Sequence, residues 1–335
     1  MRKFVASDSR RCKKYDSSRN ISVKLKNLTR RVREHLDQND DDEVSSAMPL
    51  PGLLLLQHIK STPIKASLYE PVICLILQGR KEVTLGDTTA RLDPGQSLVV
   101  SHDLPIISRI TKARPGKPYL ALVLMIDVGM LRGLYEEIGP DLVEDTDPCS
   151  LAVHEADKKL IDSLGRYLAL ASDAVEARVM APSILREIHF RLLMAPHGGM
   201  LRKLLRHDSH ASNVARAIAR IRRDFRQAIP IPELAREIGM SSSSFHKHFR
   251  NITATTPLQY QKELRLLEAR RMLAAGEESV SGVAYDVGYE SPTQFSREYA
   301  RKFGVSPRAD LARRGQATGD TELPAPPANS SIAPA

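Results

Sequence analysis

A segment in the second half of the chain occurs twice, and this repeat constrains the fold more than any other feature of the sequence. Residues 234–257 (LAREIGMSSSSFHKHFRNITATTP) and 283–307 (VAYDVGYESPTQFSREYARKFGVSP) coincide once a single residue is inserted. The residues that recur are an alanine, a glycine, two aromatic residues and a proline: Ala235, Gly239, Phe245, Phe249 and Pro257 in the first copy, and Ala284, Gly288, Phe295, Tyr299 and Pro307 in the second. The second half of the chain is therefore predicted to contain a duplicated structural unit.

The spacing within each copy predicts two helices joined by a tight turn. An alanine lets two helices cross closely, a glycine takes positive φ at the end of the first helix, and a serine caps the second. This is the helix-turn-helix arrangement, whose second helix can enter the major groove of DNA. A helical bundle with accidental similarity is the alternative, and two matched copies make it much less probable than one would.

In the first copy the second helix is predicted to run from Ser242 to about Arg250, with Ser241 as its N-cap. Phe245 and Phe249 lie four residues apart and should face the core. The outer face, which would contact DNA, then carries Ser242, Ser243, His246 and Lys247.

In the second copy Pro292 is predicted to be the first helical residue, where its fixed φ and missing N–H cost nothing. Ser291 would be the N-cap and Gln294 its capping-box partner. The predicted DNA-facing residues are Pro292, Thr293, Ser296 and Arg297, with Arg301 and Lys302 placed for phosphates. Arg297 can bond two guanine atoms at once, so it should discriminate most strongly between bases.

Between the copies, residues 257–275 are predicted to form one long helix, opened by Thr256-Pro257 and closed by Gly276. Its apolar residues fall into two stripes, one on each side of the helix. Such a helix would hold two small domains apart, so that their recognition helices address major-groove positions about one turn, roughly 34 Å, apart.

The positive charge of the chain is concentrated in this repeated region. Residues 202–314 hold 21 basic and 12 acidic residues, which gives +9, the net charge of the whole chain. Residues 44–201 hold 16 basic and 18 acidic residues. A basic segment of this kind is typical of a polyanion-binding surface, although a solvated helical surface would also carry it.

The first half of the chain predicts an α+β protein overall. Short apolar runs bounded by turn residues, such as PVICLILQG and YLALVLMI, predict strands between residues 50 and 126, arranged as a small β-barrel or jelly-roll sandwich. Helical spacing then predicts several amphipathic helices over residues 128–206, which would close the barrel or pair two subunits. The predicted domains are an effector or dimerisation domain at residues 48–206 and a DNA-binding domain at residues 207–315.

Both ends of the chain are predicted to be disordered. Residues 1–47 mix charges without a lasting apolar period, and residues 316–335 are rich in proline, alanine and serine. Met48 would serve as an alternative start. No run reaches the roughly 18 apolar residues of a membrane span, and no signal peptide is visible, so we expect a cytoplasmic, nucleoid-associated protein.

The segment 288–314 (GYESPTQFSREYARKFGVSPRADLARR) resembles the signature of the AraC/XylS family of bacterial transcription regulators. The resemblance implies a DNA-binding domain of two helix-turn-helix units and, for residues 50 to about 206, a cupin-like sensor barrel with flanking helices. It places the base-reading positions on Ser243, His246 and Lys247, and on Pro292, Thr293, Ser296 and Arg297. The serines of the first helix depart from a pattern of strong base contacts. Expected partners are promoter DNA, RNA polymerase, a small-molecule effector and a second subunit.

The sensor half offers few candidates for chemistry. It has two histidines between residues 50 and 126, His58 and His102, too few for a metal cupin, and no cofactor is expected. Cys74 should be a buried apolar residue, and a redox switch at Cys149 is a weaker hypothesis. A candidate effector pocket is lined by Cys74, Gln78, Arg80 and Lys81, although a solvent-facing strand end explains the last three equally well.

Two other classes of function remain open at this point. A cupin-type enzyme tethered to nucleic acid lacks an evident acid, base or metal set. An architectural DNA-binding protein would need no sequence preference, which the duplicated reader argues against. We therefore predict a regulator that is not an enzyme.

Overall fold

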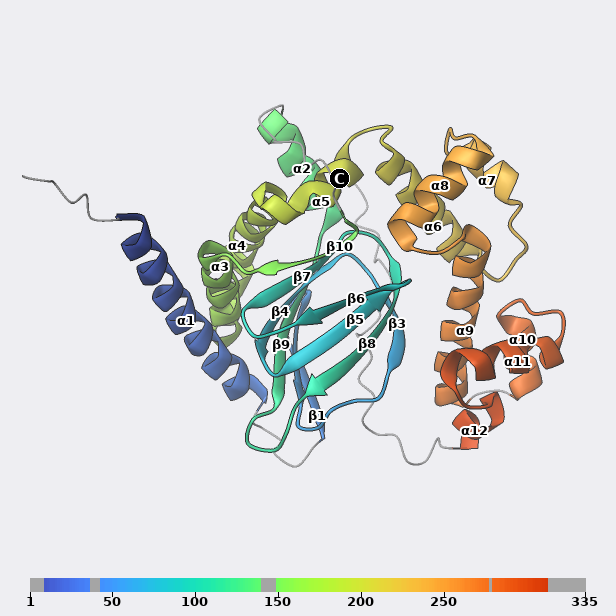
Figure 1. Cartoon of the computed structure of the whole chain (residues 1–335), viewed down its shortest axis with the longest axis horizontal. Helices are drawn as coiled ribbons and strands as arrows, with labels where there is room; N and C mark the ends of the chain where they lie inside the picture. Colours follow the sequence, from blue (N-terminus) through green and yellow to red (C-terminus); the bar gives the residue numbers. More distant parts are fainter. Residues whose placement is uncertain (1–8, 37–42, 140–148, 277–278, 313–335) are drawn as a thin grey trace, which may run out of the picture.

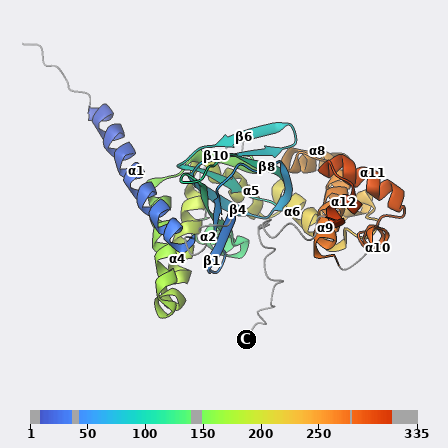
Figure 2. The ribbon, with the colours of Figure 1, turned by 90° about the horizontal axis from the view of Figure 1, so that it is seen from below.

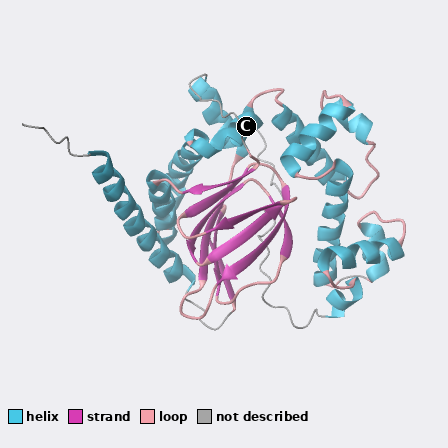
Figure 3. Ribbon diagram, viewed as in Figure 1, coloured by secondary structure: helices cyan, strands magenta, loops and turns pink. Residues whose placement is uncertain are grey.

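The computed structural model describes residues 9–36, 43–139, 149–276 and 279–312. A β-sandwich occupies the middle of the molecule, helices cover one side of it, and a helical domain lies on the other (Figure 1; Figure 3). The strands are β1 Val44–Leu50, β2 Leu53–His58, β3 Lys65–Tyr69, β4 Val72–Gln78, β5 Arg80–Leu85, β6 Thr88–Leu92, β7 Gln96–Val100, β8 Leu104–Lys112, β9 Tyr119–Met125 and β10 Leu151–Glu155. The α-helices are α1 Ser9–Leu36, α2 Val128–Ile138, α3 Lys158–Ala169, α4 Ala174–Met194, α5 Gly199–Leu205, α6 His210–Asp224, α7 Ile231–Glu237, α8 Ser242–Thr253, α9 Pro257–Ala275, α10 Val280–Asp286, α11 Pro292–Phe303 and α12 Pro307–Ala312.

The strands form two antiparallel sheets, with the orders β1-β2-β9-β4-β7-β10 and β3-β8-β5-β6. The first sheet is buried on both faces, which explains why β4 and β9 are apolar at nearly every position. Along β4, Ile73 and Leu75 pack toward the helices, whereas Cys74 and Ile76 pack between the sheets. The predicted α+β class and sandwich are therefore confirmed, but the described strands form two open sheets and not a closed barrel.

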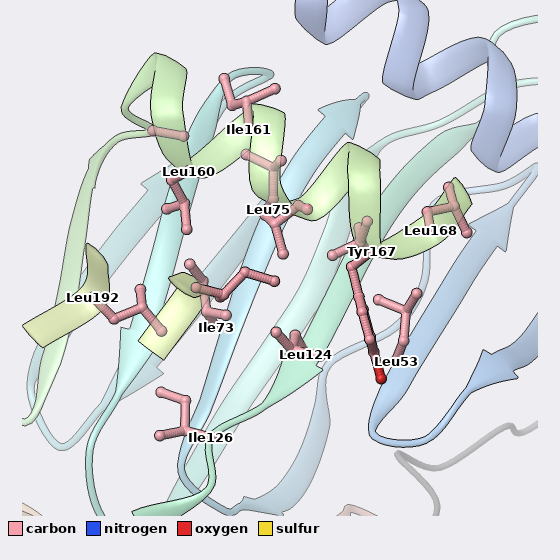
Figure 4. Packing of buried hydrophobic residues seen from close by; sticks show 14 of the residues in the cluster. Leu53, Ile73, Leu75, Leu124, Ile126, Leu160, Ile161, Tyr167, Leu168 and Leu192 are labelled. Atoms are coloured by element: carbon pink, nitrogen blue, oxygen red, sulfur yellow. The ribbon is translucent and has the colours of Figure 1, made fainter. Parts of the chain in front are cut away.

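Helices α3 and α4 cover the outer face of the first sheet. Figure 4 shows Leu160, Ile161 and Leu168 of α3 against the sheet residues, and all three are almost fully buried. Tyr167 lies in the same layer, and its hydroxyl donates to the carbonyl of Pro51 at 2.8 Å. The helical spacing read from residues 128–206 is thus confirmed, and its apolar side covers the sandwich.

Strand β10 was not foreseen in that helical region. Residues 151–155 (LAVHE) pair with β7 at the edge of the first sheet, in the register Leu151 opposite Val100. The run is too short and too polar to stand out beside the helical spacing that follows it. These residues form a strand because they pair with β7, and the local sequence does not reveal that partner.

The prediction of a disordered arm over residues 1–47 is wrong for its described part. Residues 9–36 form α1, and β1 begins at Val44. Leu28, Val32 and Leu36 are buried against α3 and the first sheet, and Ile21 and Leu25 extend the same side of the helix. This narrow stripe, three or four residues apart, is masked in the sequence by the basic residues between its members. The amino-terminal half of α1 extends away from the domain (Figure 1).

The helical domain contains two separate cores joined by α9, as predicted. Tyr260 and Leu264 of α9 belong to the first core, whereas Leu266, Ala269 and Leu273 belong to the second. The hydroxyl of Thr256 accepts from the amide of Gln259, and Gly276 ends the helix with a left-handed backbone, φ 68°. Among the described helices, none is both long and apolar enough to cross a membrane.

Candidate nucleic-acid interface

The first helix-turn-helix unit consists of α7 and α8, and we include in the first unit α6 and the residues after it, through Ile229, which share its hydrophobic core. Gly239 has φ +74° in the turn, and the hydroxyl of Ser241 accepts from the amide of Ser244 at 3.3 Å. Helix α8 continues to Thr253, three residues beyond the predicted end, because Ala254 supplies the left-handed cap. Phe245 and Phe249 are fully buried. The four predicted DNA-facing side chains are all exposed: Ser242, Ser243, His246 and Lys247.

The second unit consists of α10 and α11. Gly288 has φ +90°, and the hydroxyl of Ser291 accepts from the amide of Gln294 at 3.3 Å, so Pro292 is the first helical residue as predicted. The inserted residue of the repeat lies in this turn, where Tyr289 packs edge-on against Phe295 at 5.3 Å. The two fully buried aromatic residues, Phe295 and Tyr299, hold the helix down as expected. Thr293, Arg297 and Arg301 are exposed, whereas Pro292 and Ser296 are half-buried.

One half of the predicted capping box is not formed. The side-chain amide of Gln294 donates to the Glu298 carboxylate at 3.1 Å and does not return to the amide of Ser291. Lys262 and Tyr289 also donate to Glu298, at 3.0 and 2.8 Å. Burial alone would raise the pKa of the Glu298 carboxyl, but these three hydrogen bonds outweigh it and lower the pKa.

Gln294 itself was assigned only a capping role from the sequence. Its side chain is exposed in the first turn of α11, next to Thr293. A glutamine amide can pair with adenine in the major groove, so the exposed polar residue was a signal that the capping interpretation concealed.

Lys302 differs from the other predicted phosphate contact. Its ammonium lies 3.5 Å from the Glu263 carboxylate on α9, and its side chain is only 19% exposed. Arg301, one residue earlier on α11, is exposed. The helix thus presents Arg301 outward and ties Lys302 to its own domain.

The two recognition helices lie on one side of the helical domain. Figure 2 shows α8 and α11 along the same edge, with α10 on the opposite edge. Two exposed helices of this kind can enter successive positions of one major groove.

The first unit is docked on the β-sandwich. Arg222 of α6 donates to Glu70 at 2.5 Å and to Asp103 at 2.7 Å, both in the sandwich. The Tyr260 hydroxyl donates to the Asp103 carbonyl at 3.0 Å, and the Ser150 hydroxyl donates to the carbonyl of Ile252 at 2.5 Å. Leu68 of β3 packs onto the core of the first unit. Burial raises the pKa of the Asp103 carboxyl, and Arg222 partly offsets this effect.

His102 forms a further contact across the same joint. Its Nε2 lies 3.2 Å from the Ala211 carbonyl, so it must carry the proton, and Nδ1 then accepts from the Ser101 hydroxyl at 2.8 Å. Burial lowers the pKa of the imidazole to about 4. The histidine is therefore neutral in the folded protein near pH 7.

The four residues of the predicted effector pocket do not converge. Lys81 points between the sheets and donates to the Tyr69 hydroxyl at 2.7 Å, and Cys74 is buried in the same layer, where burial raises the pKa of its thiol. Gln78 donates instead to the Pro118 carbonyl at 2.6 Å, and Arg80 pairs with Asp93 at 2.7 Å. A register shift between Ile76 and Gln78 breaks the alternation that would have placed Gln78 on the face of Cys74, and Arg80 and Lys81, as neighbours in β5, point to opposite faces.

A cavity of about 850 Å³ lies at the joint between the sandwich and the first unit. Leu85 and Leu151 of the sandwich line it together with Ile252 of α8, and its ionisable side chains include Lys203, Arg206, Asp208 and three histidines, His207, His210 and His248. The imidazoles of His210 and His248 are stacked, with their centroids 3.7 Å apart. The exposed Cys149 also lines this cavity. Within the described ranges, no group of three or more His, Cys, Asp or Glu residues could hold a metal ion.

Two family models match the chain. The model for the N-terminus of AraC-type transcriptional regulators covers residues 49–200, and a helix-turn-helix domain model covers residues 234–313. Helix α1 lies outside both. The matches divide the chain into the same two parts as the structure, the β-sandwich with its helices and the helical domain.

Curated relatives carry the same type of name. The HTH-type transcriptional regulator ExsA of Pseudomonas aeruginosa is 24% identical over 242 residues, which cover 71% of this chain and 84% of ExsA. The HTH-type transcriptional activator RhaS of Yersinia pestis is 34% identical over 88 residues, which cover 26% of this chain and 32% of RhaS. The second match spans only about a third of that relative.

The whole arrangement is similar to solved structures of ToxT from Vibrio cholerae. An apo ToxT structure aligns with a TM-score of 0.52 at 11% identity, covering 78% of this chain and 97% of ToxT. A ToxT structure with a bound unsaturated fatty acid aligns with a TM-score of 0.51 at 12% identity, over 77% of this chain and 94% of ToxT. At this identity the likeness concerns the fold alone.

Proposed function

The chain belongs to the AraC-type transcriptional regulators, as its family matches and relatives show, and we propose that it reads promoter DNA mainly through its second helix-turn-helix unit. The observation that carries this proposal is the exposed face of α11, where Thr293 and Arg297 are exposed while Phe295 and Tyr299, on the other side of the helix, are fully buried. A guanidinium so placed can bond O6 and N7 of one guanine. Pro292 and Ser296 add short contacts at the edge of the same face.

The first unit contributes position more than sequence in this proposal. The predicted DNA-facing residues of α8 are two serines, a histidine and a lysine, none of which forms the bidentate contact of an arginine. Lys247 and Arg301 would bond phosphates, which fix the register of the protein on the duplex without reading bases. Lys302 would assist less, because its ammonium already pairs with Glu263.

The experiment that tests this proposal is selection and sequencing of genomic fragments bound by the purified protein over a salt series. We expect a defined motif that persists as salt rises. Steep salt dependence with no motif would instead identify an architectural DNA-binding protein.

We also propose that a small-molecule effector acts at the joint between the sensor and the first unit. The cavity there has the size of an ordinary ligand site, with apolar walls and several basic groups, and both domains contribute to it. A ligand that binds the docked and undocked arrangements with different affinities would shift how α8 is presented to DNA. A solved structure of ToxT contains a bound unsaturated fatty acid. Thermal unfolding of the protein with a panel of small carboxylates, compared with their neutral amides, tests this part.

A homodimer is the third part of the proposal. Helix α4 is buried along Ile184, Ile188 and Leu192, yet its opposite side exposes large apolar residues. Five of them stay 39–65% exposed, and most fall near i, i+4 spacing: Val175, Val179, Met180, Phe190 and Met194. Burying this stripe against a second copy would remove it from water. Sedimentation should give a dimer for the native chain and a monomer for Val179→Glu.

The remaining parts concern the setting of the protein. We place it in the cytoplasm at the nucleoid, in contact with RNA polymerase at the promoter, and assign it no enzymatic activity. The support is the regulatory names of its relatives. Transcription reconstituted from purified polymerase, promoter and protein would test the polymerase contact directly.

A further inference from the structure

The two helix-turn-helix units touch each other directly beside α9. A Cβ added to Gly288, in the turn of the second unit, would lie 2.1 Å from the carbonyl oxygen of Arg226 and 2.8 Å from its carbonyl carbon. Arg226 follows α6 and belongs to the first unit. The backbones of the two units therefore meet at a point where only a glycine fits.

One guanidinium bridges this contact. Arg265 of α9 donates through Nε to the Phe225 carbonyl at 2.7 Å and through Nη2 to the Gln227 carbonyl at 3.0 Å, both in the first unit. Its Nη1 donates to the Gly288 carbonyl in the second unit at 2.6 Å. Because the guanidinium is planar and its donors are fixed, the three bonds together define the relative placement of the units.

The bonds to the first unit are duplicated, whereas the bond to the second is not. The Gln261 side chain also donates to Phe225 and Gln227, at 2.9 and 2.5 Å. Loss of Arg265 would thus leave both of those carbonyls bonded and deprive only the carbonyl of Gly288. The guanidinium acts on the link between the units more than on the fold of either.

We propose that Arg265 and Gly288 are positioning residues that set the spacing and angle of the two recognition helices, so that the protein measures the separation of two major-groove sites. The proposal rests on the proposed function, in which both units engage one duplex. Each inserted base pair rotates one site about the DNA axis by roughly a tenth of a turn. A rigid pair of readers cannot follow that rotation, but a loosened pair can.

The repeat supplies a matched control. Gly288→Ala and Gly239→Ala place the same residue at equivalent turn positions, both with positive φ, +90° and +74°. Both variants therefore carry the same type of backbone strain. A Cβ at Gly239 meets nothing within 4 Å, so only the Gly288 variant pushes the units apart. Arg271→Ala, an exposed arginine of α9 that bonds Glu268, is the control for Arg265→Ala.

The experiment measures affinity for a selected DNA site and for the same site with one or two base pairs inserted between the two contacted grooves. For the native protein we expect a loss on the order of 10- to 100-fold on insertion, because the second linked contact is forfeited. In Gly288→Ala and Arg265→Ala the insertion penalty should fall below about threefold, whereas Gly239→Ala and Arg271→Ala should retain it. An unchanged penalty in the first two variants would overturn the proposal.

A second measurement needs no DNA and separates this inference from the proposed function. Spin labels at Arg250 and Arg301, exposed on α8 and α11, report the distance between the helices once Cys12 and Cys149 are replaced by serine. We expect a narrow distance distribution in the labelled parent, a broad one with Gly288→Ala or Arg265→Ala, and a narrow one with Gly239→Ala. A narrow distribution in all variants would contradict the inference even if the protein reads DNA as proposed. A protein that selects no motif while showing the broadening would instead contradict the proposed function.

Discussion

The two helix-turn-helix units share one frame but differ in their surroundings. The first unit completes its core with Leu68 from the sandwich and Met200 from α5, whereas the core of the second is built from α9 to α12 alone. The duplication dictated the position of each cap and each aromatic residue. The partner that each unit packs against was not duplicated, and for this reason we propose that the first unit receives a signal and the second reads bases.

The largest expected effect on stability comes from removing one core aromatic residue at a time. Phe245 and Phe295 are both fully buried, so substitution by alanine should cost about 3–5 kcal/mol in either unit. Phe295→Ala should increase amide hydrogen exchange in α10 to α12 and leave β3 protected. Phe245→Ala should increase exchange in the first unit and also in β3, which docks on it. Equal amide hydrogen exchange of β3 in the two variants would show that the units are not independent.

The next effect comes from Arg222, which joins the first unit to the sandwich. Arg222→Ala would leave Glu70 and Asp103 facing each other without a cation, with side chains only 19% and 16% exposed. Because Arg222 itself is 35% exposed, we expect about 1–3 kcal/mol, below the cost of breaking a fully buried pair. Urea unfolding should show this loss. Its neighbour Arg223, 68% exposed and paired with Asp224, is the control, and a similar loss in Arg223→Ala would remove the special role of Arg222.

A smaller effect should appear with pH at the same joint. The pKa of His102 is about 4 in the folded protein and near 6.5 in the unfolded chain. Between these two pH values the imidazole is protonated in the unfolded chain and neutral in the folded protein. The stability that His102 contributes is therefore present above about pH 6.5 and is lost as the pH falls toward 4. Asp103, Glu70 and Arg222 lie at the same joint and are unchanged between parent and variant.

His102→Gln should consequently lose less stability than the native protein between pH 7 and pH 5. Thermal unfolding at the two pH values measures the difference. His207→Gln serves as a control, because the side chain of His207 is 96% exposed and its imidazole lies beside the Asp208 carboxylate at the surface. An identical pH dependence for native protein and His102→Gln would contradict the buried, neutral histidine.

The smallest effect concerns phosphate contacts in the second unit. Arg301→Ala should weaken binding to all sequences alike and reduce the slope of log affinity against log salt by about 1. Lys302→Ala should change the slope less, since its ammonium is held by Glu263. A larger change with Lys302→Ala than with Arg301→Ala would reverse the assignment.

Much of the reader domain could be predicted because its signals are local. Ser241 and Ser291 cap helices within three residues, and the glycine of each turn takes its positive φ whatever lies outside the unit. The start of α11 at Pro292 follows from the same local rules. Local errors were the end of α8, which lies three residues beyond Arg250, and the side chain of Gln294, because Glu298 competes for its amide from the next turn of the helix.

The joint between the domains could not be predicted in this way. Arg222 meets residues more than a hundred positions earlier in the chain, and in the sequence it resembles any other surface arginine. The side chains of the predicted effector pocket do not converge for a related reason, since a register shift in β4 turns Gln78 away from Cys74, and Arg80 faces the opposite side of β5 from Lys81. Contacts between segments distant in the sequence, and not local propensity, determine both the joint and the direction of these side chains.

The difference between the two readers is tested most directly by selecting bound DNA sequences with the native protein, Arg297→Ala and Lys247→Ala, and comparing the base preference at each position. Arg297→Ala should lose the preference for one guanine, equivalent to about 1–3 kcal/mol, and keep the others. Lys247→Ala should bind all fragments more weakly with its preferences intact. If Lys247→Ala loses a base preference while Arg297→Ala keeps every one, the first unit is the reader and the assignment made here is wrong.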